Sequence, residues 1–300
     1  MWNTAKARQQ KPFKSIRRNS MKRMMYIISK NWVWIPTIIL TIMFITPILW
    51  SLSASFKSMV EIYSARTLWD FLPKNPSLRA YGEVLAWKDF PVVFFNSTFL
   101  AISSTLVAVA ASILAGYAFA RYAFRWRHVL LLAILIPRIL PRVSLIIPLY
   151  ELMVSLGLMD SRLWLTITYS ATAIPLASWV LAGFFAAIPN DLDEAATIEG
   201  ASLWQILWYI LIPVSWPGIV TALIMCIRES WNEFPFVLAF TTSVSARTLP
   251  YQLFLLRESV GVQDWSVVNA FTILSILPML MVFVILQRYI VKGVTLGAIK

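Results

Sequence analysis

The chain has 300 residues, of which 59% are hydrophobic and only 13% are charged, and its mean hydropathy is +0.72. This composition excludes an ordinary soluble domain and indicates a membrane protein. The formal net charge is +12, and most of it comes from a basic N-terminal region. Such a segment next to a membrane favours contact with anionic lipid over binding of nucleic acid.

Six stretches of the chain approach or exceed the roughly 20 residues that an α-helix needs to cross a bilayer. In hydrocarbon only helices or closed barrels satisfy the backbone, and apolar runs this long and continuous are helices. We therefore predict an all-α, polytopic membrane bundle with six transmembrane helices, at Trp34–Ala54, Phe95–Ala120, Val129–Met153, Leu163–Ala187, Gly218–Phe240 and Val267–Ile290.

The positions of the 26 basic residues predict the orientation of these spans. Most lie in the N-terminal region, in the loop between spans two and three, and at the C-terminal end, and fewer lie in the alternate loops. We therefore expect both termini in the cytoplasm. The predicted organisation is a basic cytoplasmic segment at residues 1–31, a transmembrane domain at 32–292 and a cytoplasmic tail at 293–300.

Residues that would carry chemistry are scarce. The sequence has no GxxxxGK[ST] loop to cradle a nucleotide phosphate, so the chain is not itself an ATPase. His128 is the one histidine and Cys226 the one cysteine, which excludes a His/Cys metal cluster and an intrachain disulfide. We therefore expect neither a metal, a bound cofactor nor a catalytic residue in this chain, and any energy for transport must come from a partner.

The segment Asp193–Pro213, reading DEAATIEGASLWQILWYILIP, is a polar, acid-rich stretch between two hydrophobic spans. Its layout of EAA at Glu194–Ala196, a glycine four residues on and a proline at the end resembles the signature cytoplasmic loop of permease subunits of ATP-binding-cassette (ABC) importers. The motifs IPLYELMVSLGLMDS, GFFAAIP, WNEF, ARTLP and QRYIVKGVTLGA are similar to those of carbohydrate-importer permeases. Over roughly residues 35–300 the chain most resembles the smaller permease subunit of maltose-type importers.

This resemblance implies the fold of a type I importer permease in a bacterial cytoplasmic (inner) membrane. It implies a second permease subunit, which we expect to be non-identical, two ABC ATPase subunits that bind ATP and Mg²⁺, and a solute-binding protein outside. The loop at about residues 188–213 would dock onto the ATPase, with alanines allowing close approach, a glycine the turn and acids the charge. The residues predicted for this coupling are Asp193, Glu194, Ala195, Ala196, Glu199, Gly200 and Ala201.

An ordinary amphipathic helix at the membrane surface is the alternative for this loop. Such helices favour lysine and arginine on their polar face, which this segment lacks. The resemblance also implies that the outside loop at Thr241–Asp264 meets the solute-binding protein, through Tyr251, Arg257, Glu258 and Gln263.

Arginines inside the predicted spans depart from the family pattern, since neutral-sugar relatives usually have uncharged residues there. Arg138 and Arg142 are four residues apart in span three and would share one helix face, and Arg228 lies in span five. A charge facing lipid at mid-membrane costs about 2.5 to 3.5 kcal/mol, so these arginines should face a protein interior or a wet pathway. The predicted path residues are Arg138, Arg142, Arg228, Glu229, Trp231, Asn232 and Glu233.

Two carboxylates for three guanidinium groups leave at least one positive charge without a partner. Because arginine engages both oxygens of a carboxylate, we hypothesise that the path carries an anionic oligosaccharide of uronic acids, such as an alginate-like one. One alternative is a neutral sugar, with Arg228 paired to Glu233 or to an acid of the partner permease. Another is a phosphorylated small solute. A channel or scaffold without an ATPase is the alternative from a different class.

Overall fold

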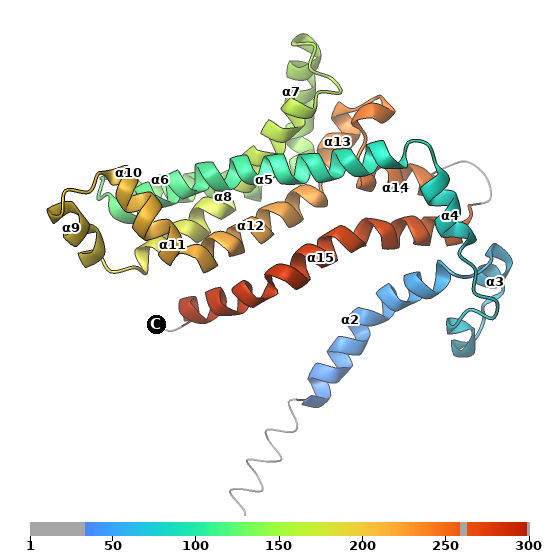
Figure 1. Ribbon diagram of the computed structural model, residues 1–300. Coiled ribbons are helices and arrows are strands. Elements are labelled where there is room, and N and C mark those ends of the chain that lie inside the picture. Colours follow the sequence, from blue (N-terminus) through green and yellow to red (C-terminus); the bar gives the residue numbers. More distant parts are fainter. Residues whose placement is uncertain (1–33, 259–262, 299–300) are drawn as a thin grey trace, which may run out of the picture.

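The computed structural model describes residues 34–258 and 263–298, and in that part of the chain all regular structure is helical (Figure 1). The basic segment predicted at residues 1–31 and the last two residues of the predicted tail lie outside the described residues. The described elements are α2 (Trp34–Ala54), α3 (Met59–Ser64), η1 (Leu68–Phe71), α4 (Arg79–Ala86), α5 (Phe90–Arg121), α6 (Arg127–Ile139), α7 (Arg142–Ser155), α8 (Arg162–Ala186), α9 (Asp191–Ile198), α10 (Leu203–Gln205), η2 (Ile206–Leu211), α11 (Ile212–Val214), α12 (Trp216–Trp231), α13 (Pro235–Phe240), η3 (Val244–Ala246), α14 (Leu249–Glu258) and α15 (Trp265–Ala298).

Four of these helices are long and apolar enough to cross a bilayer: α2, α5, α8 and the part of α15 at Trp265–Tyr289. Two further spans are bent pairs. Helices α6 and α7 meet at 89°, and the segment Leu203–Val214 meets α12 at 80°. When each bent pair is counted as one span, the described chain has up to six spans, the number that the sequence predicts. The second pair covers Leu203–Trp231, which differs from the predicted bounds of Gly218–Phe240.

The third predicted span, Val129–Met153, is broken rather than continuous. Helix α6 ends at Ile139 and α7 begins at Arg142. Pro141 has no backbone N–H and forces the preceding Leu140 into an extended conformation, with ψ at 136°. Arg138 and Arg142 therefore do not share a face of one helix, as the sequence predicted, but flank the break.

The fifth predicted span, Gly218–Phe240, is also two helices, because α12 stops at Trp231 and α13 starts at Pro235. A proline is tolerated in the first turn of a helix, where its missing N–H is not needed. The side chain of Glu233 accepts a hydrogen bond from the Phe236 N–H at 3.3 Å and so caps the new helix. The break places this carboxylate in the interior of the bundle.

The core of the bundle is the packing of α5 against α8, with α12 contacting both. Small residues at every fourth position of α5 form the buried stripe that makes this close approach possible: Ser104, Ala108, Ser112 and Gly116. Serine hydroxyls in this region also form hydrogen bonds between helices. Ser104 donates to Ser230 on α12 at 2.8 Å, and Ser170 on α8 donates to the Ser104 carbonyl at 3.1 Å.

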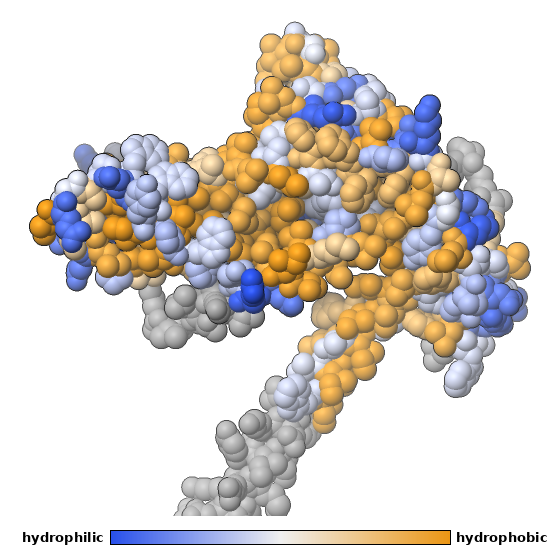
Figure 2. All heavy atoms as spheres, viewed as in Figure 1, coloured by the Kyte–Doolittle hydropathy of each residue, from blue (hydrophilic) through white to orange (hydrophobic). Residues whose placement is uncertain are grey.

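Helices α2 and α15 lie at the side of this core (Figure 1). Helix α15 packs against α12. Helix α2 contacts α15, and α2 is buried only at its own C-terminal end, so most of the apolar side chains of α2 remain exposed. Figure 2 shows a broad apolar band over the middle of the bundle and along α2, with polar residues gathered toward the two ends. This distribution is the one expected of side chains that face lipid.

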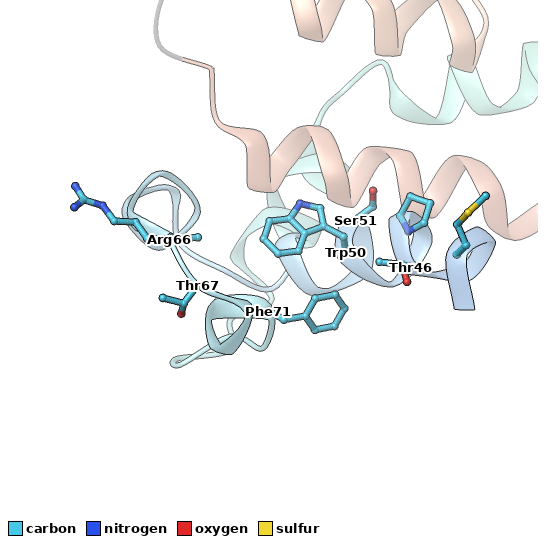
Figure 3. Close-up of a pocket in the computed structure, with 9 residues that line it drawn as sticks. Thr46, Trp50, Ser51, Arg66, Thr67 and Phe71 are labelled. Atoms are coloured by element: carbon cyan, nitrogen blue, oxygen red, sulfur yellow. The ribbon is translucent and has the colours of Figure 1, made fainter. Parts of the chain in front are cut away.

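A cleft of about 940 Å³ lies between α2 and the segment that carries η1 (Figure 3). The rings of Trp50 and Phe71 lie near one another in it, tilted and with centroids 5.8 Å apart. Arg66 is the one charged side chain among the described residues that line the cleft. The cleft is therefore mainly apolar and lies apart from the arginines predicted for the translocation path.

Candidate coupling and translocation sites

Helix α9, the predicted coupling element, lies at one end of the bundle, and α3, α4 and α14 lie toward the other (Figure 1). Its first turn carries Asp191, Asp193 and Glu194, and negative charge is favourable beside the partial positive charge of a helix N-terminus. The predicted loop at 188–213 is thus a short acidic helix, a turn and a second helical segment that begins at Leu203.

Arg121, the last residue of α5, fixes α9 to the bundle. Its guanidinium donates hydrogen bonds to the Ile188 carbonyl at 3.0 Å and to Oδ1 of Asn190 at 2.7 Å. It also lies 2.7 Å from the Asp193 carboxylate, and only 7% of the Arg121 side chain is exposed. Asp193 was predicted to offer its charge to a partner ATPase, but its carboxylate already pairs within this chain.

The alanines of the loop divide between the core and the surface. Ala196 is buried in the same hydrophobic cluster as Leu211 and Phe185, which corrects its predicted place on the docking face. Ala195 is exposed, as are Glu194 and Glu199, and Ala201 is half-buried. The most exposed apolar side chain of α9 is Ile198, with 88% of its surface open to contact.

Gly200 ends the α9 turn with φ at +86°, a left-handed conformation that side chains disfavour. No atom lies within 4 Å of the position that a Cβ would take there. The glycine is therefore required by the backbone conformation and not by crowding, and it allows Ala201 to donate a hydrogen bond to the Ala196 carbonyl at 2.9 Å.

A second site forms where the α6–α7 break meets the end of α12. Nη1 of Arg138 contacts both oxygens of Glu229, at 3.2 and 3.0 Å, and donates to the Thr172 carbonyl at 3.2 Å. Arg142 donates from one terminal nitrogen to Glu229 and from the other to Glu233. Because Thr172 lies near the middle of α8, this four-residue cluster lies near the middle of the bundle.

The two arginines and two carboxylates of this cluster neutralise one another. The side chains of Glu229 and Glu233 are only 8% and 2% exposed, and buried charges of this kind need partners. The positive charge that the sequence left unpaired therefore falls on Arg228. That side chain is exposed and forms no ion pair with any described residue, and its predicted pairing with Glu233 is corrected, since Glu233 pairs with Arg142.

Two other predicted path residues lie apart from this cluster. Trp231 is buried, and its indole N–H donates to the Ser275 carbonyl of α15 at 3.2 Å, so it packs against that helix. Asn232 is exposed and donates to the Arg228 carbonyl at 2.7 Å. Trp231 is therefore a packing residue between α12 and α15, contrary to its predicted place on the path.

A cavity of about 360 Å³ opens beside the ion-pair cluster. Its walls come from α6, α7, α8, α12 and α13, and among the residues that line it are Arg138, Arg142, Glu229, Trp164, Thr168, Thr172 and Phe236. The sequence reasoning missed the α8 members of this set. The signal was a run of hydroxyl residues at alternating positions within an apolar span: Thr166, Thr168, Ser170 and Thr172.

The predicted contact residues for a binding protein lie on and after α14. Arg257 and Glu258 are exposed at the end of the helix. Tyr251 is half-buried beneath the Arg247 guanidinium, 5.5 Å from the ring centroid, and the Gln263 side chain donates to the Arg257 carbonyl. The chain between these residues, at 259–262, lies outside the described part.

Comparison with known proteins identifies the family. The family described as "Binding-protein-dependent transport system inner membrane component" matches residues 108–296. The chain belongs to this family. The predicted resemblance to ABC importer permeases and the predicted all-helical permease fold are therefore confirmed.

Similar proteins cover most of the chain. The sulfoquinovosyl glycerol transport system permease protein SmoH of Agrobacterium fabrum is 32% identical over 85% of this chain and 88% of its own. The trehalose/maltose transport system permease protein MalG of Thermococcus litoralis is 31% identical over 95% and 99%. A chain of a bacterial ABC transporter involved in import of the acidic polysaccharide alginate has the same fold, with a TM-score of 0.75 and 23% identity over 90% of this chain and 98% of that one.

Proposed function

We propose that the chain is a permease subunit of an ABC importer for oligosaccharides, in particular acidic ones. The observation that carries the transport role is the clamped helix α9, which presents a mixed apolar and acidic face at one end of a transmembrane bundle. Because Arg121 of α5 is bonded to Asn190 and Asp193, α9 is firmly attached to α5. A partner that moves α9 therefore also moves α5. Relatives at 31 to 32% identity are named as permeases of sugar transport systems.

The proposed assembly contains this chain, a second, non-identical permease, two ATPase subunits that hold ATP and Mg²⁺, and a solute-binding protein. It would lie in a bacterial inner membrane, with both termini and α9 on the cytoplasmic side. The proposed ATPase contacts on α9 and its turn are the exposed Glu194, Ala195, Ile198 and Glu199. A structure of an alginate transporter in complex with its periplasmic protein shares this fold, with a TM-score of 0.61.

The preference for an acidic substrate is proposed from charge. The described bundle carries one exposed, unpaired arginine on α12, and a partly exposed one, paired with Glu229, in the cavity at the α6–α7 break. Sulfoquinovosyl glycerol, named for SmoH, is a sulfonated sugar and therefore anionic, whereas the sugars named for MalG are neutral. A neutral oligosaccharide is thus the second candidate, in which the ion-pair cluster is purely structural.

The coupling role is tested by Ile198→Asp, because a charge on the most exposed apolar residue of α9 would have to be desolvated when the ATPase docks. We expect the variant chain to insert, but to lose at least about tenfold in retention of the ATPase and in ATP-driven uptake by reconstituted vesicles. Trp69→Asp is the matched control, since Trp69 is 92% exposed and lies on η1, away from α9 in the chain. Retention of the ATPase at the parental level by Ile198→Asp would reject the docking face.

A further inference from the structure

The two arginines of the ion-pair cluster are bonded differently. Each terminal nitrogen of Arg142 contacts a different carboxylate, so both are engaged. The hydrogen bonds of the Arg138 side chain to described residues are all made by Nη1, and its Nη2 has none. With 30% of its side chain exposed, Arg138 therefore keeps a free donor edge on the cavity of about 360 Å³.

Other groups around the cavity also suit a sugar. Trp164 supplies aromatic surface, and Phe236, which is only 1% exposed, closes the wall behind it. The hydroxyls of Thr168 and Thr172 donate to carbonyls of their own helix, so toward a ligand their oxygens can accept. The indole N–H of Trp164 is buried and has no hydrogen-bond partner within the described parts of the chain. Protein sites for small molecules are mostly apolar with a few polar groups, and a cavity of this size is at the small end of their range.

We propose that this cavity binds one acidic sugar unit of the passing oligosaccharide, with the carboxylate on the free edge of Arg138, and that Arg142 holds the helix break in place. The inference rests on the proposed import of acidic oligosaccharides. Arg138 stays bonded to Glu229 through Nη1, which orients its guanidinium and offsets part of its charge. Binding of the substrate is therefore moderate, as transit requires, since a site along a pathway must also release its occupant.

Arg142 has the positioning role because it joins three parts of the bundle. It is the first residue of α7, it pairs with Glu229 on α12, and it pairs with Glu233, which also caps α13. Removing this guanidinium leaves two buried carboxylates with less compensation, which is strongly destabilising. A substitution at Arg142 should therefore affect assembly first, and one at Arg138 should affect transport first.

The test compares Arg138→Gln and Arg142→Gln in the complete transporter, reconstituted with its partner permease, ATPases and binding protein. Uptake is measured with an oligouronate trisaccharide at saturating loaded binding protein, so that the maximal rate reports the permease step. For Arg138→Gln we expect this rate to fall about tenfold or more, from loss of a charged hydrogen bond. Yield and melting temperature of the complex should fall clearly less than in Arg142→Gln, because Glu229 keeps Arg142 as a partner. Arg142→Gln should lower yield and melting temperature.

Two further variants separate cavity from charge. Ala171→Leu fills the cavity without altering a charged group and should also slow uptake of the trisaccharide. Arg125→Gln removes an exposed arginine from the turn before α6 and should leave uptake unchanged.

The possible outcomes distinguish the Arg138 site from the proposed import of acidic oligosaccharides. Parental uptake of the trisaccharide by Arg138→Gln would overturn the inference and leave acidic import intact. A loss of assembly in Arg138→Gln as large as that in Arg142→Gln would also overturn it, because Arg138 would then be structural. If the parent transporter imports only uncharged sugars, the acidic substrate itself is rejected.

Discussion

At the scale of single residues, Asp160 joins the turn between α7 and α8 to the segment that follows α13. Its carboxylate accepts hydrogen bonds from the Thr242 N–H at 2.8 Å, the Thr242 hydroxyl at 2.7 Å and the Ser243 N–H at 3.0 Å. Partial burial raises the pKa of this carboxyl, but the hydrogen bonds outweigh burial and hold the pKa below its usual value. The ionised form is therefore the one that stabilises this junction.

We predict that Asp160→Asn lowers the free energy of unfolding at pH 7 by about 1 kcal/mol, since the site is partly open to water. Asparagine tolerates the left-handed φ of +60° at this position, so backbone strain does not contribute. Because the folded pKa is depressed, the stabilisation is present above the unfolded pKa of about 3.9 and is lost as pH falls through the folded pKa. Melting temperatures of parent and variant should differ at pH 7, and the difference should shrink progressively as pH falls below about 3.9. A difference that stays constant over this range would contradict this account.

The sequence predicted which charged residues lie in the spans but not how they pair. Arg138, Arg142, Glu229 and Glu233 were all named, since charges inside apolar runs are conspicuous. Their pairing depends on the rotation of each helix and on two chain breaks, which hydropathy does not report. Arg121 and Asp193 lie far apart in the sequence, and their ion pair depends on α9 lying beside the C-terminal end of α5.

At the scale of elements, helix packing in this bundle depends on small side chains. A Cβ built on Gly116 of α5 would lie 2.9 Å from the Leu181 Cβ and 3.0 Å from the Ala182 nitrogen of α8. The neighbouring atoms are backbone or the base of a side chain, so they cannot move without shifting the helix. The absence of a side chain at Gly116 therefore lets α5 and α8 approach closely, as small residues do between membrane helices.

We predict that Gly116→Ala destabilises the permease by about 1 to 3 kcal/mol, the usual cost of overpacking a core. Gly183→Ala is the matched control, because it makes the same change within α8 where no atom lies within 4 Å of the new Cβ. Melting of the purified complex should fall for the first variant only. Equal melting temperatures for the two variants would show that the α5–α8 contact can accommodate the added methyl group.

The predictability of elements follows from their length and composition. Apolar runs of about 20 residues predicted the number and order of the spans, because hydrophobic thickness sets helix length. The breaks were harder to predict. Span three contains two prolines, and helix α6 continues through Pro137 but ends before Pro141, where the chain bends by 89°.

At the scale of the whole molecule, α5 connects the two ends of the bundle. At one end Arg121 holds Asn190 and Asp193 of the coupling region. At the other, Asn96 donates hydrogen bonds to the carbonyls of Ser245 and Arg247, in the segment before α14, at 2.8 and 2.9 Å. The proposed ATPase face and the proposed binding-protein face are thus attached to the same helix.

We predict that Arg121→Gln uncouples these two faces. The ATPase should still be retained, because its proposed contacts on α9 are unchanged, but stimulation of ATP hydrolysis by loaded binding protein should fall by about tenfold or more, as expected when a buried charged contact is lost. Arg125→Gln, an exposed arginine four residues on, should leave stimulation unaltered. The measurement is ATP hydrolysis by reconstituted complexes with and without loaded binding protein, and full stimulation of the Arg121 variant would rule out this link.

Helix α5 runs for 32 residues, about 48 Å, with no proline beyond its first turn. Such a helix is stiff over its own length, so it transmits displacement as a lever does. A tilt imposed at Arg121 appears at Asn96 at once, with the opposite sense if the pivot lies at the serine contacts between α5 and α8. The two ends of the bundle would then move in opposite directions, so that one end opens as the other closes. This coupling would need no series of side-chain rearrangements between them.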